Sequence, residues 1–463
     1  MVRTLSSILV FLMAAAIATF AGTRSAASAS YSDVSAAVSA ALPGDTVQVP
    51  AGSATWSSTL TITKGVSLRG AGAGATIVTS GGGNRIVAYV PDAASRSGDV
   101  PFDVSGFTFE GGGVKVDGMI YITADSTHPI TKVTIHDNKF DNTNNSGTAI
   151  YIDGAVYGVA YSNTFLDIAI VLRGLANNRQ SWDNEPFAFG DSRYFYFEDN
   201  TISFTKDCGF NGWVEGGHGG RYVLRYNTWN MTNTTSFLDV HDMHGNQSLD
   251  GALYATIIAE VYGNIYTGMR AGRWMCQRGG RLLMFNNLWT GTNGLPWTQV
   301  REEYDDVLSP TNSNQVQHVN NSYFWNNWAN GAEIPAEISQ ANANDPQPSH
   351  VNPLVENVSF WNYKASFTGS AGIGAGSAAP TMSLTAGVGY WVTGHVPAGA
   401  PPTTMADLKT YCQAGRFYTA TATNTWALLY APYAYPHPLR SLASPPGDSG
   451  SGPNPPTRLR IKG

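Results

Sequence analysis

The sequence is poor in charged residues and in cysteine, and it has no block of basic residues. Charged side chains make up 13% of the 463 residues, and the formal net charge is -6. A nucleic-acid partner is therefore not expected, because binding to phosphates needs clustered Lys and Arg. The three cysteines, Cys208, Cys276 and Cys412, have no metal-type spacing. We expect buried thiols and no disulfide framework, although Cys208 could pair with Cys276.

A sustained helical periodicity is also missing, which excludes the helical repeat folds, and the composition does not fit leucine-rich repeats. Glycine, in contrast, occurs 50 times, and Asn, Thr and Ser crowd the middle of the chain. This composition is typical of many short strands joined by tight turns. Since 463 residues exceed the size of one compact core, the chain is predicted to form either several domains or an elongated repeat.

The two ends of the chain differ from its middle. Residues 1–29 have the pattern of an export signal: Arg3, an apolar run from Ile8 to Ala21, and small residues at Ala27-Ser28-Ala29 for cleavage. The apolar run is short for a membrane span, so we expect a secreted bacterial protein without a membrane partner. Residues 441–463 are rich in Pro, Gly and Ser and are predicted to be a linker.

An internal repeat runs through residues 133–323. Each copy is a strand-like apolar stretch that ends in Asn, any residue, and a large apolar residue, as in VTIHDNKF and YVLRYNTW. The copies are separated by roughly 23 to 37 residues, which fits one coil of a parallel β-helix with insertions. A β-propeller is the alternative, but the irregular spacing counts against it. The repeated asparagines are Asn138, Asn163, Asn200, Asn227, Asn264, Asn287 and Asn321.

The asparagine at each turn has a physical reason. Asn tolerates left-handed backbone angles, and its amide can bond the same group on the coils above and below. The large residue two places later is expected to point inward and stack on its equivalents. Stacked coils then bury a continuous apolar column that no single coil could bury alone.

The segment before the repeat is predicted to cap it. Residues 31–42 form an amphipathic pattern, with Val34 and Val38 on one face and Ser32 or Asp33 as the helix cap. GDTVQVPAG and TLTITKGVSLRGAG then give strands and turns in quick succession. A helix over the first coil would hide an open sheet edge.

This order of helix, short strands and Asn-containing coils resembles the pectate-lyase-like superfamily of secreted right-handed parallel β-helix proteins. The resemblance covers residues 30–365 and implies an all-β solenoid, but it assigns no activity, because the superfamily contains lyases, hydrolases, esterases and tailspikes. Residues 366–440 are rich in aromatics and resemble a C-terminal block of bacterial β-helix proteins. We expect this tail to pack back onto the last coils.

Candidate site residues come from a second strand in each coil, aligned by the glycine that closes it. If that register holds, one exterior column contains charged residues from successive coils. A structural salt-bridge ladder is the alternative explanation for such a column. The members of the column are Asp153, Arg173, Glu215, one of Asp239, His241, Asp242 and His244, and Arg278.

β-Elimination of an acidic polysaccharide fits these residue types. Such a lyase must neutralise a uronate carboxylate and supply a base for the C5 proton. Arg173, Arg273 and Arg278 are candidates for the carboxylate clamp, and His241 or Lys206 for the base. Arg270, His244, Trp213 and Trp274 are candidates for substrate binding. Asp239, Asp242 and Glu215 are candidate calcium ligands.

Three other interpretations remain open at this point. A glycoside hydrolase would use a pair of carboxylates from Asp239, Asp242 and Glu215. A zinc site from Asp239, His241 and His244 has no known ligand spacing. A non-catalytic glycan-binding adhesin would use exposed aromatics, unless these stack inward: Trp213, Trp274, Trp289, Trp297 and Trp325. The sequence favours a monomeric polysaccharide lyase.

Overall fold

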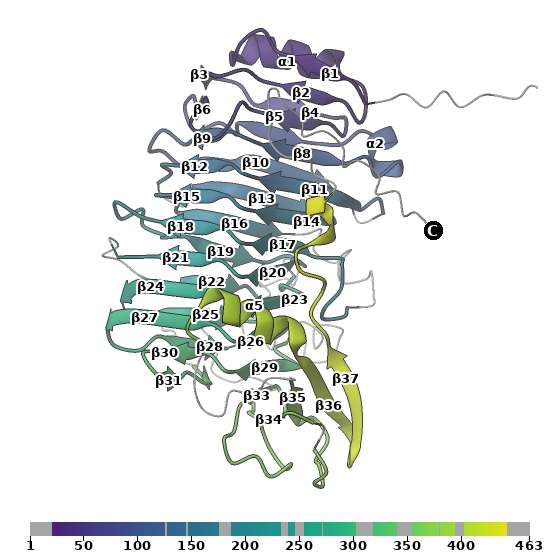
Figure 1. The fold of residues 1–463 in the computed structure, drawn as a ribbon, viewed down its shortest axis with the longest axis vertical. Coiled ribbons are helices and arrows are strands. Elements are labelled where there is room, and N and C mark those ends of the chain that lie inside the picture. Colours follow the sequence, from purple (N-terminus) through teal and green to yellow (C-terminus); the bar gives the residue numbers. More distant parts are fainter. Residues whose placement is uncertain are drawn as a thin grey trace, which may run out of the picture.

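Three long sheets run side by side along the molecule (Figure 1). The computed structural model describes residues 21–125, 127–144, 147–175, 187–232, 239–245, 254–270, 272–301, 318–339, 354–378, 380–393 and 402–441. Within these residues the chain visits sheets A, B and C in turn, and every coil adds one strand to each sheet. In these three sheets the described strands of successive coils pair in parallel, and the one antiparallel pair is β30 with β31 at the end of sheet B. The predicted parallel β-helix is therefore confirmed.

The strands of each sheet stack in chain order. Sheet A contains β1 (Thr23–Ser25), β2 (Thr46–Gln48), β5 (Ser67–Arg69), β8 (Phe102–Ser105), β11 (Ile130–His136), β14 (Val156–Tyr161), β17 (Phe195–Glu198), β20 (Arg221–Arg225), β23 (Ile258–Tyr262), β26 (Arg281–Phe285), β29 (Ser322–Trp325) and β33 (Phe360–Asn362). Sheet B contains β3 (Gly52–Trp56), β6 (Thr76–Ser80), β9 (Thr108–Glu110), β12 (Lys139–Asp141), β15 (Thr164–Leu166), β18 (Thr201–Ser203), β21 (Thr228–Asn230), β24 (Ile265–Arg270), β27 (Leu288–Asn293), β30 (Trp328–Ala329) and β31 (Ala332–Glu333). Sheet C contains β4 (Leu60–Ile62), β7 (Val87–Tyr89), β10 (Asp117–Ala124), β13 (Thr148–Gly154), β16 (Ile170–Leu175), β19 (Trp213–Gly216), β22 (Asp239–Met243), β25 (Arg273–Gln277), β28 (Trp297–Val300) and β32 (Ala336–Ile338).

The inward residues of sheet B form an aromatic stack, as the repeat predicts. The large residue that follows each Asn-x pair is in register with its equivalents on the neighbouring coils, and the Phe140 and Phe165 rings are stacked 4.9 Å apart. Aromatic side chains bury large apolar areas, so this column supplies much of the core. The stacked positions are Phe109, Phe140, Phe165, Ile202, Trp229, Tyr266 and Trp289.

A ladder of buried asparagines lines the turn between sheets A and B. Each side-chain amide donates to the Oδ1 atom of the next asparagine at 2.9 to 3.2 Å. The ladder confirms the predicted column, with one correction: after Asn287 it continues to Asn327, and not to Asn321. Moreover, the left-handed residue of the turn is the one before the ladder asparagine, such as Asp137 (φ 52°) and Asp199 (φ 55°). The ladder asparagines serve as hydrogen-bonding groups.

Helix α1 (Tyr31–Ala40) covers the first coil at the purple end of the molecule (Figure 1). It begins at Ser30, whose side chain accepts from the Asp33 N–H, and it buries Val34, Ala37 and Val38. Residues 21–29, which the sequence assigns to the export signal, also belong to the fold: β1 pairs in parallel with β2. The β-helix therefore starts before residue 30. Among the described residues, no helix has the length and apolar character needed to cross a membrane.

The C-terminal tail runs back along the outer face of sheet A. It contains α5 (Met405–Ala414), a sheet of β34 (Ile373–Gly376), β35 (Gly389–Val392), β36 (Arg416–Ala422) and β37 (Thr425–Tyr430), and the 3-10 helix η2 (Pro438–Ser441). Phe417 stacks on Trp325 of a late coil, whereas the Arg440 guanidinium lies 4.5 Å from the Tyr161 ring of a much earlier coil. The tail therefore covers one side of the solenoid over many coils, and not only the last coils as predicted.

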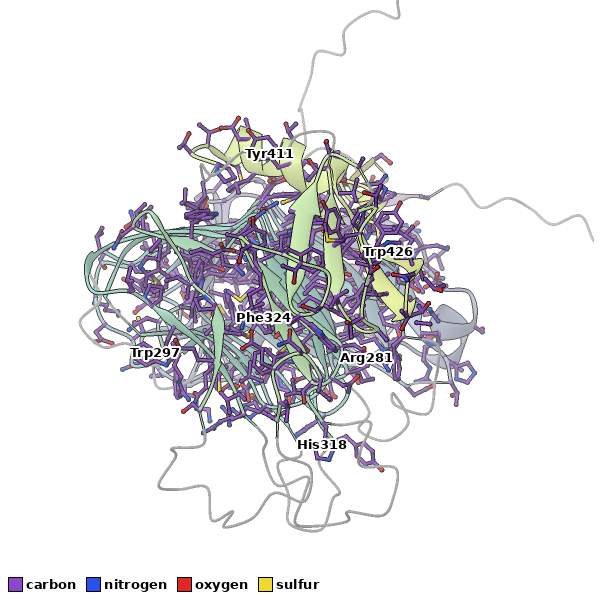
Figure 2. All side chains as sticks on the ribbon, turned by 90° about the horizontal axis from the view of Figure 1, so that it is seen from below. Arg281, Trp297, His318, Phe324, Tyr411 and Trp426 are labelled. Atoms are coloured by element: carbon purple, nitrogen blue, oxygen red, sulfur yellow. The ribbon has the colours of Figure 1, made fainter. Side chains whose placement is uncertain are left out.

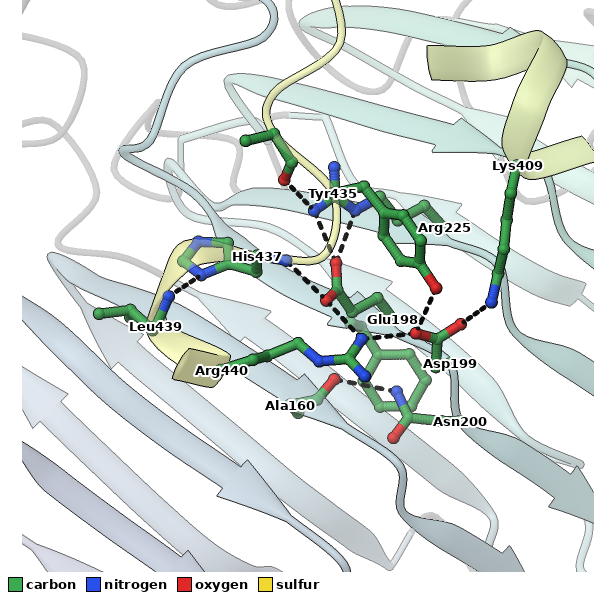
Figure 3. A network of polar contacts seen from close by, with 12 residues as sticks. Ala160, Glu198, Asp199, Asn200, Arg225, Lys409, Tyr435, His437, Leu439 and Arg440 are labelled. Carbon is green, nitrogen blue, oxygen red and sulfur yellow. Dashed lines mark hydrogen bonds and ion pairs between the residues drawn. The ribbon is translucent and has the colours of Figure 1, made fainter. Parts of the chain in front are cut away.

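A network of ion pairs holds the tail against sheet A (Figure 3). Glu198 and Arg225, both fully buried, approach to 2.6 Å on adjacent coils. Arg440 of the tail bonds Glu198 at 2.9 Å and Asp199 at 2.5 Å, and Lys409 of α5 bonds Asp199 at 2.7 Å. Because the tail and this network cover the outer face of sheet A from β11 onward, that part of the face is occupied by the protein's own residues.

Candidate functional site

The outer face of sheet C carries charged residues on three successive coils. Arg173 of β16, Glu215 of β19 and Asp242 of β22 are in register. Side chains alternate along a strand, so the neighbours of these residues, Val214 and His241, face the core. The column continues in register with Cys276 of β25 and Gln299 of β28. The predicted stacking of Arg173, Glu215 and a member of the Asp239 to His244 group is thereby confirmed.

The charges of this column are arranged as pairs. Arg173 Nε lies 2.6 Å from Glu215 Oε2, and the Arg278 guanidinium is bonded to Asp242. His244 lies between the two carboxylates, with its Nε2 atom 3.7 Å from Glu215 and 3.9 Å from Asp242. The backbone fixes His244 here, since its N–H donates to the Gly216 carbonyl one coil earlier at 2.9 Å. Two cations, two carboxylates and one imidazole thus share one patch.

Asp242 Oδ1 and Trp213 Nε1 of this patch are buried, and neither has a hydrogen-bond partner in the described part of the chain. The Trp213 ring stacks on Phe210 at 4.7 Å and contacts His244 edge-on at 6.2 Å. Buried polar atoms are nearly always bonded, so each such atom requires an explanation. Both atoms are covered by the protein itself.

An arginine and a tryptophan flank the column on the later coils. Arg273 Nη1 donates to Gln299 Oε1 at 2.8 Å, and Arg273 is in register with Trp297. Trp297 is 45% exposed, near the rim of the solenoid in Figure 2, whereas Phe324 lies in the interior of the same view. An exposed indole beside a guanidinium is suited to bind a sugar ring that carries an acid group.

Two tyrosines extend the column on the earlier coils. Tyr121 and Tyr151 are in register with Arg173. The Tyr121 hydroxyl donates to Asp153 at 2.7 Å, and the Arg85 guanidinium lies 3.6 Å from the centre of the Tyr121 ring. From Tyr121 to Gln299 the column crosses seven strands, or about 29 Å at the usual strand spacing. The face is long enough for several sugar units.

Two predicted site residues lie in the core instead. His241 is fully buried, and its Nε2 atom lies 2.5 Å from the Tyr266 hydroxyl. Burial lowers the pKa of the His241 imidazole to about 3. Trp274 is also fully buried, 5.4 Å from Trp289. The predictions of an exposed base at His241 and of a sugar-binding Trp274 are therefore wrong, because the strand alternation turns both side chains inward. Trp289 and Trp325 are likewise buried.

The alignment by closing glycines is wrong on two coils. The prediction placed Asp153 beside Arg173. In the structure Asp153 is in register with Leu175, and the residue beside Arg173 is Tyr151. The reason is that Gly154 ends its strand in a left-handed conformation with φ 95°, whereas Gly174 continues the strand and pairs with Gly216. Arg278 is likewise two residues beyond the column position of Cys276, and only its long side chain brings it back to Asp242.

Three other predicted residues have different surroundings. Lys206 lies on the turn between sheets B and C, where its ammonium group is bonded to Asn142 two coils earlier. Asp239 pairs with Arg273 in the backbone register of sheet C, and Arg270 ends β24 of sheet B. The side chains of Asp239 and Arg270 lie outside the part of the chain that the structure describes.

The calcium prediction stays a prediction, because the side chain of Asp239, one of its three ligands, lies outside the described residues. Over the described ranges, no group of three or more His, Cys, Asp or Glu side chains is placed to hold a metal ion. Glu215 and Asp242, two of the three predicted calcium ligands, are each bonded to an arginine, which already supplies the compensating charge. Cys208, Cys276 and Cys412, which all lie in described segments, are buried and form no disulfide.

Sequence reasoning missed the residues that extend the column. Tyr121, Tyr151, Cys276 and Gln299 occupy the same register position as Arg173 and Asp242. Tyr151 is two residues before Asp153 in the strand that was aligned by its glycine. The sequence holds no clear signal for this register, because Ala149-Ile150 and Ala169-Ile170 look alike although Ile150 is in register with Leu172.

Comparisons with known proteins were made for the whole chain. No protein family model and no curated protein sequence matches it. Among solved structures it is similar to an alginate lyase from Paenibacillus sp. str. FPU-7, at 11% identity and a TM-score of 0.42, over 70% of this chain and 99% of that chain. It is also similar to the mannuronan C-5 epimerase AlgE6 A-module of Azotobacter vinelandii, at 16% identity and a TM-score of 0.29, over 68% and 92% of the two chains. The parallel β-helix itself rests on the strand pairing described above.

Proposed function

We propose that this protein is a secreted enzyme that cleaves an acidic, uronate-containing polysaccharide by β-elimination on the outer face of sheet C. One observation carries the proposal: Arg173, Glu215 and Asp242 stand in register on three coils, with Arg278 on Asp242 and His244 between the two carboxylates. This patch combines the cationic and basic groups that elimination requires, on a face long enough for several sugar units.

The arginines would neutralise the uronate carboxylate. The C5 proton of a uronate becomes acidic only when the charge of the neighbouring carboxylate is compensated. A guanidinium has five N–H donors and binds carboxylates in a bidentate way. Glu215 engages Arg173 at Nε, Asp117 lies 3.4 Å from its Nη1, and the side chain of Arg173 is 17% exposed. A substrate carboxylate would share the remaining donors of Arg173, with Arg273 and Arg278 on the following coils.

His244 would take the C5 proton. A neutral imidazole is a suitable base near neutral pH, and neighbouring carboxylates orient the ring through its other nitrogen. His244 replaces His241 in this role because it is the histidine of the column's own face.

Hydrolysis and simple binding remain the competing functions. A glycoside hydrolase needs one protonated carboxyl group as general acid. Glu215 and Asp242 are both bonded to arginines, so neither carboxyl group is free to act on a sugar without breaking an ion pair. A glycan-binding protein would use the exposed Trp297 and the Tyr121 and Tyr151 pair without turnover. Calcium would act as an added bridge to the substrate and not as the main neutralising charge.

A substrate screen distinguishes these functions. The purified full chain would be incubated with alginate, pectate, chondroitin and a neutral glycan, each with and without EDTA, and products would be followed by ultraviolet absorbance and by reducing ends. Elimination yields unsaturated, absorbing ends on an acidic glycan, and we expect this in the presence of EDTA as well. Reducing ends without absorbance would identify a hydrolase, and binding without product would identify an adhesin; either result overturns the proposal.

A further inference from the structure

The first described residues are built into the end of the solenoid. The Gly22 N–H donates to Asp45 Oδ1 at 2.6 Å, and Arg24 Nε lies 3.2 Å from the other carboxylate oxygen. The Gly22 carbonyl accepts from Thr46 at 2.8 Å, which starts the pairing of β1 with β2. Asp45 is only 3% exposed. Gly22 is therefore fixed at both its nitrogen and its oxygen.

Cleavage after Ala29 would remove this part of the fold. Ala26 and Ala29 are buried in the core, and the Ala29 carbonyl accepts a buried hydrogen bond from Trp56 Nε1 at 3.0 Å. Loss of β1 would also expose the edge of β2 and leave the Asp45 carboxylate without two of its donors. Unpaired edges and unpaired buried charges are both costly. A mature chain starting at Ser30 would lack these contacts.

The sequence offers a processing point on the other side of β1. The apolar run from Ile8 ends at Ala21, and Thr19 and Ala21 provide small residues at the positions that signal peptidases require. Cleavage there would retain every contact of residues 22–29. A cut three residues earlier, after Ala18, would also retain β1 but would leave Gly22 inside a peptide bond.

We propose that the peptide bond between Ala21 and Gly22 is hydrolysed on export, and that the new α-ammonium group of Gly22 forms an ion pair with Asp45. Water adds across the bond, so that Ala21 leaves with a carboxylate and Gly22 gains an amine. An α-amine has an ordinary pKa of about 7.7–8.0 and is mainly protonated at neutral pH. The nitrogen that donates to Asp45 would then carry a full positive charge 2.6 Å from a buried carboxylate. The pair would pin the end strand of sheet A under α1.

Two measurements test this. The full chain would be expressed with its own leader in an exporting bacterium, and the N-terminus of the exported protein would be determined by mass spectrometry. A start at Gly22 is expected. A start at Ser30 or at Thr19 would overturn the proposal, because the first lacks β1 and the second lacks the ammonium group on Asp45.

The second measurement isolates the charge. The protein starting at Gly22 would be compared with one that carries a single added Ala before Gly22, in the parent and in Asp45→Asn. At pH 6 the added Ala should lower the Tm of the parent protein by about 2 °C. In the Asp45→Asn protein the added Ala should leave the Tm unchanged. Since the pair raises the α-amine pKa, the difference should fade as the pH rises above about 8. Equal Tm values for both parent forms at pH 6 would contradict the ion pair.

Discussion

Arg173 and Glu215 lie 2.6 Å apart although 42 residues separate them in the chain. They face each other because β16 and β19 pair in parallel, with Arg173 opposite Glu215. The same stacking brings Asp242 and Arg278 beside them. The candidate site is thus a property of the coil register, and each of its members can be tested separately.

Arg173→Gln should reduce kcat/KM on an acidic glycan by about 10- to 100-fold, because a hydrogen bond to a charged group contributes about 1.5–3 kcal/mol. The far-ultraviolet circular dichroism should not change. Arg193→Gln is a matched control, since Arg193 bonds Asp191 on the sheet A side of the molecule. If Arg173→Gln retains full activity, Arg173 does not neutralise the substrate.

His244→Ala should lose about 10²- to 10⁴-fold in kcat, the usual contribution of a general base. The loss should be largest in kcat, because the arginines and aromatics that bind the chain of sugars remain. His128→Ala is a control at an exposed histidine of the turn after β10. Full turnover by His244→Ala would assign the base to another residue.

His241→Ala should act on stability and not on the site's own chemistry. The imidazole is fully buried beside Tyr266, so its removal leaves a cavity and an unbonded hydroxyl. The expected loss is about 3 kcal/mol in the free energy of unfolding, measured by chemical denaturation. A His241→Ala protein of unchanged stability would contradict the inward position of this residue.

Glu260 should make stability depend on pH. Burial raises the pKa of its carboxyl group to about 7, from an ordinary value of 4.5, while Oε1 accepts the Gly190 N–H at 2.6 Å. Because the folded pKa is raised, the stabilisation is complete below pH 4.5 and is lost as the pH rises through about 7. Glu260→Gln should lack this loss, which amounts to about 3 kcal/mol. Tm values of both proteins across this range would show it; parallel curves would disprove it.

Asn200→Ala should break the asparagine ladder. The Asn200 Oδ1 atom accepts the backbone N–H of Asn163 at 2.9 Å, and its amide donates to the Ala160 carbonyl at 3.0 Å. Removal leaves buried backbone groups unbonded, at about 1–3 kcal/mol each. Chemical denaturation should therefore show a clear loss relative to Asn84→Ala, where the side chain is exposed. Equal stability of the two variants would mean that the ladder is not stabilising.

Local patterns in the sequence were sufficient to predict the solenoid fold. The Asn-x-aromatic repeat predicts the ladder and the inward stack of Phe140 and Phe165, because each coil repeats the same turn and the same inward position. The helix at residues 31–40 follows from its own periodicity, although its cap is Ser30 and not the predicted Ser32 or Asp33. Such features depend on residues that are near neighbours in the chain.

The site required the tertiary structure, because its residues meet only through pairing between coils. A two-residue shift at Gly154 put Tyr151, and not Asp153, beside Arg173, and strand alternation turned His241 inward while His244 stayed with Glu215. The sequence by itself determined that the chain forms stacked coils with a charged face. The register between coils decided which charges meet, since one step along a strand turns a side chain from the solvent to the core.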